Sequence, residues 1–210
     1  AKVLICLDIR NFFNTIKYPR VMELIKILLA KRPIVESTDE NAQVIAELLT
    51  YRGRVPQGAP TSPTVSNLIC LKLDKNLSRL QTIYKCTITR YADDISISSK
   101  DNPHLPRIIS SISNLLREES FQINKEKTRV LRRNRSMRVV GIVVNERLNV
   151  PHKKWREFRA KLHNLRMSKE KITPLEYQKL RGYCEWVSTL NPTKGKQFLT
   201  ELGRIPLKDA

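Results

Sequence analysis

Tyr91-Ala92-Asp93-Asp94 places two adjacent carboxylates between two segments rich in β-branched residues, at 83–90 and 95–99. The second segment alternates apolar with polar side chains, so the pattern predicts a β-hairpin with the acids at its tip. Neighbouring carboxylates repel each other, and Mg²⁺ is a hard ion that prefers carboxylate oxygens and bridges them to phosphates. A metal-holding hairpin is therefore one interpretation. An ordinary Asp-rich turn is the other, because Asp also favours turns through local hydrogen bonds.

The chain is strongly basic, and the excess is uneven. Its 210 residues hold 39 Lys and Arg against 20 Asp and Glu, a formal net charge of +19. Residues 1–100 hold 15 basic and 9 acidic side chains, a net +6, whereas residues 101–210 hold 24 and 11, a net +13. This balance predicts a polyanion-binding protein whose C-terminal half makes much of the phosphate contact. No apolar run approaches the roughly 18 residues that span a bilayer, which disfavours a membrane protein.

The cysteines show no metal-binding or disulfide pattern. Cys6, Cys70, Cys86 and Cys184 are scattered, with no C-x-x-C pair and no His at ligand spacing. We therefore expect reduced thiols in a cytoplasmic protein.

Apolar periodicity predicts an α+β body up to about residue 150. The run at 2–7 is continuous, as in a strand buried on both faces, and Asp8 follows at its end. Helices are expected at about 18–32, 39–51, 62–80 and 102–118, and short strands at 121–123, 128–131, 137–144 and 148–150.

Local signals set several helix boundaries. Arg32-Pro33 ends the first helix, and Asn102-Pro103 begins the fourth. Ser37 and Glu40 have the spacing of a capping box for the second helix. Its expected apolar stripe consists of Val44, Ile45, Leu48 and Leu49. A loop rich in Gly and Pro precedes the third helix, for which Thr61 or Ser62 is the expected cap and Pro63 fits the first turn.

From Pro151 onward the pattern predicts helices without strands, at about 151–166, 174–189 and 192–203. Thr173-Pro174 and Asn191-Pro192 are start signals for the last two. We therefore expect an α+β domain at 1–150 and a basic helical domain at 151–210. Packing in the helical core is the favoured interpretation of Trp155 and Trp186, and stacking on nucleic acid is the alternative. The candidates for nucleic-acid binding are Arg132, Arg133, Arg135, Lys153, Lys154, Arg156 and Arg159.

Asp8 suggests a chemical role for the paired acids. A carboxylate at the end of a central strand and two at the tip of a neighbouring hairpin can meet in space. Three such carboxylates can hold two Mg²⁺ ions about 3.5–4 Å apart, an arrangement that stabilises the attacking and leaving oxygens in phosphoryl transfer. This chemistry favours acids over His or Cys, because the ions must also keep phosphate and water ligands.

Three segments are similar, in their order, to the palm motifs of reverse transcriptases. They are Leu7-Asp8-Ile9-Arg10-Asn11-Phe12-Phe13-Asn14-Thr15-Ile16, Pro56-Gln57-Gly58-Ala59-Pro60-Thr61-Ser62-Pro63-Thr64-Val65-Ser66-Asn67-Leu68 and Tyr91-Ala92-Asp93-Asp94. The second and third resemble the bacterial retron and group II intron branch most closely, and the segments at 121–128 and 139–145 resemble further motifs of that branch. The resemblance covers essentially the whole chain. It implies a polymerase palm, an antiparallel sheet with packed helices, followed by a helical thumb.

The resemblance also implies roles for individual residues. Asp8, Asp93 and Asp94 would be the catalytic triad and metal ligands, with the Ile9 carbonyl as a further ligand. Phe13 would be the gate that excludes a 2′-hydroxyl, Gln57-Gly58 would lie beside the incoming nucleotide, and Lys127 would lie near its triphosphate. From the residues alone, other interpretations stay open. Phe12 or Phe13 can belong to the core, the Gln57 loop can be a helix entry, and Lys127 can be a solvated side chain.

The activity that the resemblance implies is RNA-directed DNA polymerisation by a nucleotidyltransferase. A primer 3′-hydroxyl would attack a deoxynucleoside triphosphate on an RNA template with two Mg²⁺ ions, while the thumb grips the RNA/DNA duplex. The retron likeness further implies a structured noncoding RNA as template and partner, an effector protein and a role in phage defence.

Two departures from the retron pattern leave alternatives open. Relatives carry a fingers region before the first motif, so we expect preceding sequence or another chain to supply it. Val139-Val140-Gly141 stands where retron proteins have Val-Thr-Gly, which keeps a group II intron-type or other defence-associated reverse transcriptase open. An RNA-templated RNA polymerase, disfavoured by Phe13, and a non-catalytic RNA-binding palm module are the remaining alternatives.

Overall fold

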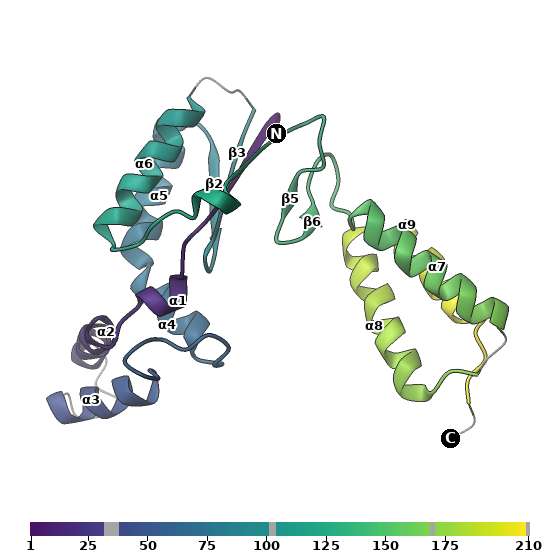
Figure 1. Ribbon diagram of the computed structural model, residues 1–210, viewed down its shortest axis with the longest axis horizontal. Helices are drawn as coiled ribbons and strands as arrows, with labels where there is room; N and C mark the ends of the chain where they lie inside the picture. The colour runs from purple at the N-terminus through teal and green to yellow at the C-terminus, as the bar shows by residue number, and fades with distance from the viewer. Residues whose placement is uncertain (32–37, 101–103, 169–170, 209–210) are drawn as a thin grey trace. The chain divides into compact units, whose positions relative to one another are not determined.

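A computed structural model describes residues 1–31, 38–100, 104–168 and 171–208. The chain divides into two compact units, residues 1–131 and residues 132–210. Figure 1 labels the helices and strands of both units. Within the described ranges, no helix is both long and apolar enough to cross a membrane.

A four-stranded sheet lies at the centre of the first unit, in the order β2-β3-β1-β4. The strands are β1 (Val3–Asp8), β2 (Thr87–Tyr91), β3 (Asp94–Ser99) and β4 (Arg129–Arg132). β3 pairs antiparallel with both β1 and β2, so the predicted hairpin is confirmed and lies beside the N-terminal strand. Val3, Leu4 and Ile5 are all buried, as expected for a strand covered on both faces.

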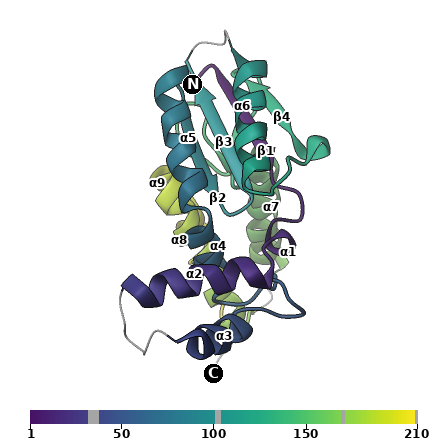
Figure 2. The ribbon, with the colours of Figure 1, turned by 90° about the vertical axis from the view of Figure 1, so that its left-hand side faces the viewer.

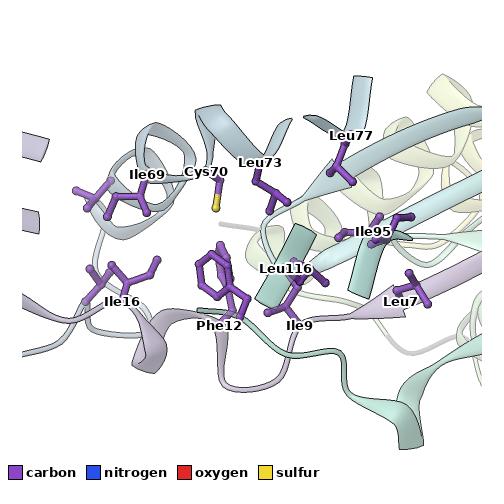
Figure 3. Packing of buried hydrophobic residues seen from close by; sticks show 14 of the residues in the cluster. Leu7, Ile9, Phe12, Ile16, Ile69, Cys70, Leu73, Leu77, Ile95 and Leu116 are labelled. Atoms are coloured by element: carbon purple, nitrogen blue, oxygen red, sulfur yellow. The ribbon is translucent and has the colours of Figure 1, made fainter. Parts of the chain in front are cut away.

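Two long helices, α5 (Leu71–Tyr84) and α6 (Leu105–Glu118), cover one face of this sheet (Figure 2). Leu73 and Leu77 of α5 share one buried cluster with Leu7 and Ile95 of the sheet (Figure 3). The buried positions of α6 are Ile108, Ile112 and Leu116, on the face that its sequence predicts. Burying one such side chain contributes roughly 1.5–3 kcal/mol, so this layer fixes the strands that carry the acids.

The helix predicted at 62–80 is divided in two. α4 (Ser62–Ile69) ends at Cys70, whose ψ of 3° departs from helical geometry, and α5 follows at once. α5 then continues to Tyr84, so the strand predicted from residue 83 begins only at Thr87. Leu80 and Tyr84 keep the helical period and pack against the core, which outweighs the β propensity of this segment. Lys85, with a φ of 47°, ends the helix.

α2 (Tyr18–Lys31) and α3 (Asp39–Leu48) pack against each other (Figure 2). The Thr38 side chain caps α3 by accepting a hydrogen bond from the Asn41 N–H. The predicted cap Ser37 lies outside the described residues, as do the predicted boundaries Arg32-Pro33 and Asn102-Pro103.

The apolar stripe predicted for α3 is partly wrong. Ala42 and Ala46 are its buried positions, whereas Val44 and Leu48 are exposed. Small alanine side chains let two helices approach closely, so the face with the alanines packs against α2 although its side chains are less hydrophobic.

The short strands predicted after α6 are formed only in part. β4 matches the strand at 128–131, but 121–123 and 148–150 contribute only isolated bridges. The strand predicted at 137–144 is a hairpin of β5 (Arg138–Val139) and β6 (Ile142–Val143). Its turn residues Val140 and Gly141 both have positive φ, the condition for a type I′ turn that reverses the chain.

The second unit contains the helices α7 (His152–Ser168), α8 (Pro174–Leu190) and α9 (Pro192–Leu202), close to their predicted ranges. Both predicted start signals are confirmed, because the side chains of Thr173 and Asn191 accept backbone hydrogen bonds in the first turns of α8 and α9. Trp155 packs against the buried cluster of this unit, as expected. Trp186 is 40% exposed and packs beside Tyr183, so its assignment to the core is wrong.

Candidate active site

Strand pairing brings three acids to one end of the sheet. Asp8, the last residue of β1, lies opposite Asp94, the first residue of β3. Asp93 belongs to the two-residue turn between β2 and β3, and its carbonyl accepts a hydrogen bond from the Ile9 N–H at 2.9 Å. Ala92, the other turn residue, has a φ of 52°, which a residue with a Cβ adopts only where its surroundings stabilise it. The backbone therefore sets the spacing of the acids.

Lys127 reaches the same end of the sheet. It is the last residue of the short helix η1 (Lys125–Lys127), and its Nζ lies 3.0 Å from Asp8 Oδ2. The pKa of Lys127 is raised because its ammonium donates a hydrogen bond to Asp8 and lies in the field of that carboxylate and of the paired acids. The structure therefore pairs Lys127 with Asp8, while its expected place near a triphosphate stays a prediction.

The acids also influence one another. Burial raises the pKa of Asp94, and the negative charges of Asp93 and Asp8 raise it further, while Lys127 lowers it. A divalent cation would relieve this repulsion. Among residues 1–31, 38–100, 104–168 and 171–208, no three His, Cys, Asp or Glu side chains are arranged as a metal-binding group. Asp8 is instead oriented to Lys127, but the donor set of carboxylate oxygens fits a hard divalent cation.

A cavity of about 300 Å³ lies beside the acids. Its lining comes from the end of β1 and the turn after it, the loop before α4, the β2–β3 turn and the segment around η1. The lining residues are Asp8, Ile9, Arg10, Asn11, Phe12, Phe13, Asn14, Gln57, Asp93, Asn124 and Lys127. Asp94 and Gly58 do not line it, although each adjoins a residue that does. The sequence assigned no role to the lining residues Arg10, Asn11, Asn14 and Asn124. All four lie within motif segments, but only the structure shows that they share one cavity.

Phe12 and Phe13 have different environments. Phe12 is 3% exposed, and its ring centroid lies 5.3 Å from that of Phe121 in the core. Phe13 is half-buried and lines the cavity, with its ring centroid 5.2 Å from that of Phe12 in an edge-on contact. Both belong to α1 (Phe12–Thr15), in which successive side chains point about 100° apart. Phe12 is therefore the core residue of the pair.

The loop before α4 places Gln57 at the cavity. Gly58 has a φ of 95°, and a Cβ there would meet no atom within 4 Å, so backbone conformation rather than space favours glycine. The Ser62 hydroxyl donates a hydrogen bond to the Pro56 carbonyl, which ties the loop to the first turn of α4. Thr61 takes the N-cap position without a side-chain capping bond, so capping by Thr61 or Ser62 is not formed as predicted.

The basic candidates of the second unit are all exposed. They are Arg132, Arg133, Arg135, Lys153, Lys154, Arg156 and Arg159. Arg133 and Lys153 have glutamate partners at 2.8 Å and 3.9 Å. Arg159 lies over the Trp155 ring, with 4.8 Å from Cζ to the ring centroid, and lines a groove of about 1110 Å³ between α7 and α9. Sequence reasoning missed this groove because it depends on how two helices pack.

The family model described as reverse transcriptase (RNA-dependent DNA polymerase) matches residues 1–144, which include the three acids and the whole cavity lining. This chain belongs to the reverse transcriptase family. Its curated relatives include several retron reverse transcriptases, which confirms the resemblance to the retron branch. Enzymes of this family use divalent metal ions.

Three relatives show the extent of the similarity. Retron Mx162 reverse transcriptase of Myxococcus xanthus is 32% identical over 236 residues, covering 98% of this chain and 48% of that protein. Retron Mx65 reverse transcriptase of Myxococcus xanthus is 32% identical over 215 residues, covering 94% and 48%. Retron Ec86 reverse transcriptase of Escherichia coli is 25% identical over 209 residues, covering 99% and 62%. The chain thus spans about half the length of the first two relatives.

Solved structures support the fold. Telomerase from Candida albicans, in complex with a TWJ fragment of telomeric RNA, matches 97% of this chain and 40% of its own chain at a TM-score of 0.55. Telomerase from Candida tropicalis, with the corresponding fragment, matches 95% and 38% at the same TM-score. Sequence identities of 13% and 11% restrict this likeness to the fold. With the family match, it confirms the predicted α+β palm and thumb.

Proposed function

We propose that this chain contains the palm, residues 1–150, and the thumb, residues 151–210, of an RNA-directed DNA polymerase. It extends a primer 3′-hydroxyl with deoxynucleoside triphosphates on an RNA template. One observation carries the proposal: Asp8, Phe13, Gln57, Asp93 and Lys127 come from separate segments of the sequence and line a single cavity. In the resemblance to reverse transcriptase motifs, these residues all serve RNA-directed DNA synthesis. Membership of the reverse transcriptase family supports the same reaction.

The acids hold the metal in this proposal. Asp8, Asp93 and Asp94 provide carboxylate oxygens for Mg²⁺, and the Ile9 carbonyl provides a further ligand. Two bound Mg²⁺ ions would supply electrostatic stabilisation of the attacking and leaving oxygens of the transferred phosphoryl group. Lys127 holds a proton at Nζ, 3.0 Å from Asp8 Oδ2, where it can be donated to the departing pyrophosphate.

Other cavity residues select and orient the nucleotide. The half-buried Phe13 ring excludes a 2′-hydroxyl and so favours deoxyribose. Gln57 and Gly58 lie beside the incoming nucleotide and the template, where the positive φ of Gly58 keeps the loop close to its ligand. The exposed arginines and lysines of the second unit contact phosphates of the RNA/DNA duplex.

The retron relatives extend the proposal to biological context. A structured noncoding RNA serves as template and partner, and the polymerase acts in phage defence with an effector protein. Sequencing of RNA that copurifies with the protein tests this part. One enriched structured RNA is expected, whereas random cellular RNA would contradict this part of the proposal.

Primer extension tests the polymerase itself. The protein, produced from its complete reading frame, is given a primed RNA template, Mg²⁺ and either deoxyribonucleotides or ribonucleotides, with Asp93→Asn as the control. Extension by wild type with deoxyribonucleotides only, and loss of extension in Asp93→Asn, is the expected result. Incorporation of ribonucleotides alone would indicate an RNA polymerase. RNA binding without any extension would indicate a non-catalytic module.

A further inference from the structure

Arg90 directly precedes the Tyr91-Ala92-Asp93-Asp94 stretch, and its side chain is only 5% exposed. Its guanidinium forms a bidentate ion pair with Asp74 of α5, from Nε to Oδ1 at 2.6 Å and from Nη2 to Oδ2 at 2.7 Å. Nη1 donates to the Ala92 carbonyl at 3.0 Å and to Asn67 Oδ1 of α4 at 3.3 Å. One buried side chain therefore connects the turn that contains Asp93 to two helices.

The turn needs support that the sheet does not supply. β2 is an edge strand, so it is paired only with β3 on one side. Ala92 has a left-handed φ of 52°, a conformation that costs about 1–3 kcal/mol where a side chain is present. Its carbonyl belongs to the peptide unit that joins Ala92 to Asp93. A hydrogen bond to that carbonyl fixes the plane of this peptide and, with it, the direction of the Asp93 backbone.

The chemistry of the contact requires arginine. A planar guanidinium can bind a carboxylate with one edge and still donate from its remaining nitrogen, whereas an ammonium acts as a point charge. Arg90 uses both possibilities, because Nε and Nη2 bind Asp74 while Nη1 binds the turn. An exposed pair in the same unit, Lys26 with Asp39, lacks this combination of burial and fixed direction.

We propose that Arg90 is a positioning residue for the acids. Held by Asp74 and Asn67, it keeps Ala92 in its left-handed conformation, so that Asp93 and Asp94 are presented beside Asp8. The role of these acids in the reaction rests on the proposed function, whereas the restraint on the turn does not. Arg90 is not among the residues that line the cavity, so it acts on the acids through the turn.

Three measurements on Arg90→Met and Arg90→Lys test the proposal, with Arg79→Met as the matched control. Arg79 is an exposed residue of α5, and its Nη1 donates to Asn76 Oδ1 on the same helix at 3.3 Å. The measurements are hydrogen–deuterium exchange of the peptide that spans the turn, Mn²⁺ affinity by electron paramagnetic resonance, and primer extension kinetics.

In folded Arg90→Met we expect the turn amides to exchange roughly tenfold faster, while amides in the buried part of β1 keep their protection. Mn²⁺ affinity is expected to fall about tenfold, and kcat to fall at least about tenfold with an unchanged KM for primer–template. Arg90→Lys keeps the positive charge but lacks the planar guanidinium, so we expect exchange rates, Mn²⁺ affinity and kcat between those of wild type and Arg90→Met. Arg79→Met is expected to match wild type in every measurement.

The proposal is overturned if folded Arg90→Met exchanges its turn amides and binds Mn²⁺ as Arg79→Met does. If Arg90→Met does not fold, Asn67→Ala replaces it, because this variant removes one restraint on Nη1 and leaves the Asp74 pair intact. The same criteria then apply to Asn67→Ala. A wild-type protein that neither binds Mn²⁺ nor extends primers would refute the proposed function. Hydrogen–deuterium exchange of the turn amides would still test whether Arg90 restrains the turn.

Discussion

Phe13 is a half-buried side chain that lines the cavity with Asp8 and Asp93, where we propose that it excludes a 2′-hydroxyl. Phe13→Ala removes the bulk that faces the cavity and leaves the core residue Phe12 unchanged. We expect the preference for a deoxyribonucleotide over the matching ribonucleotide to fall by roughly 10- to 200-fold, the range typical of a steric pocket. The ratio of the two kcat/KM values measures this preference. Phe13→Tyr retains the bulk and should keep it, and an unchanged ratio in Phe13→Ala would exclude the gate.

The protonation state of Asp94 affects the stability of the folded chain. Its pKa is raised, so the folded chain binds this proton more tightly than the unfolded chain does. Protonation of Asp94 therefore adds to the free energy of unfolding. This contribution is complete below the ordinary pKa of 3.8 and is lost as the pH rises through the raised pKa of the folded chain. In the presence of a chelator, Asp94→Asn should therefore have a higher Tm than wild type at about pH 7, and the difference should shrink towards about pH 4.

Thermal unfolding followed by circular dichroism across this pH range measures the effect. Glu118→Gln, which neutralises an exposed acid at the end of α6, is the control and should show no comparable gain. A lower Tm for Asp94→Asn at neutral pH would mean that the acids do not repel one another in the folded chain.

Site residues were predictable where charged side chains stand out against the local sequence pattern. Asp93 and Asp94 interrupt a strand pattern and Asp8 follows an apolar run, so the sequence marks all three acids as candidates. Their meeting at one end of the sheet required the strand pairing of the structure. The contacts of Arg90 and the position of Asn124 in the cavity lining were not predicted, because they depend on residues distant in sequence. The structure was also needed to decide which of Phe12 and Phe13 is buried in the core, because two adjacent phenylalanines are equally hydrophobic.

At the scale of the element, the contact between α8 and α9 depends on a glycine. A Cβ at Gly195 would lie 2.4 Å from the Ser188 Cα and 1.9 Å from its Oγ, and the backbone atom cannot move aside cheaply. Gly195→Ala is therefore expected to destabilise the second unit by about 1–3 kcal/mol, as in other overpacked interiors. Urea unfolding, followed by a signal from this helical unit, measures the change.

Gly182 provides the matched control within α8. A Cβ at Gly182 would have no atom within 4 Å, so Gly182→Ala adds helix propensity without a clash. We expect it to stabilise the same unit by roughly 0.5–1 kcal/mol. Equal effects of the two substitutions would show that helix propensity, rather than close packing, determines the result at Gly195.

Helices were predictable where apolar periodicity and capping residues agree. The three C-terminal helices have periodic apolar faces, and two of them have Thr-Pro or Asn-Pro starts, so their ranges were close to those observed. The break at Cys70 has no Gly or Pro to announce it. The β5–β6 hairpin places Val140 at a positive φ of 47°, which is unusual for a β-branched residue, so the segment resembled one strand.

At the scale of the whole molecule, net charge governs the interaction with nucleic acid. Binding to an RNA/DNA duplex is expected to weaken steeply with salt, because each neutralised phosphate releases counterions. Lys154→Met should weaken binding and reduce the slope of log K against log salt by about 0.7–0.9 if Lys154 contacts one phosphate. Fluorescence anisotropy with a labelled duplex measures the slope. Arg181→Met, at a residue already paired with Glu185 at 2.8 Å, should leave it unchanged.

We propose that Asp8, Asp93 and Asp94 act together in metal-dependent synthesis of DNA on RNA. The most direct measurement is the single-turnover rate of deoxynucleotide addition by Asp8→Asn, Asp93→Asn and Asp94→Asn on a primed RNA template. Asp39→Asn, at an exposed acid of α3, is the control. We expect each triad variant to bind the primed template normally and to lose at least about 100-fold in rate, while the control keeps the wild-type rate. Deoxynucleotide addition by any of the three variants at the rate of Asp39→Asn would show that the substituted acid is not required for the reaction.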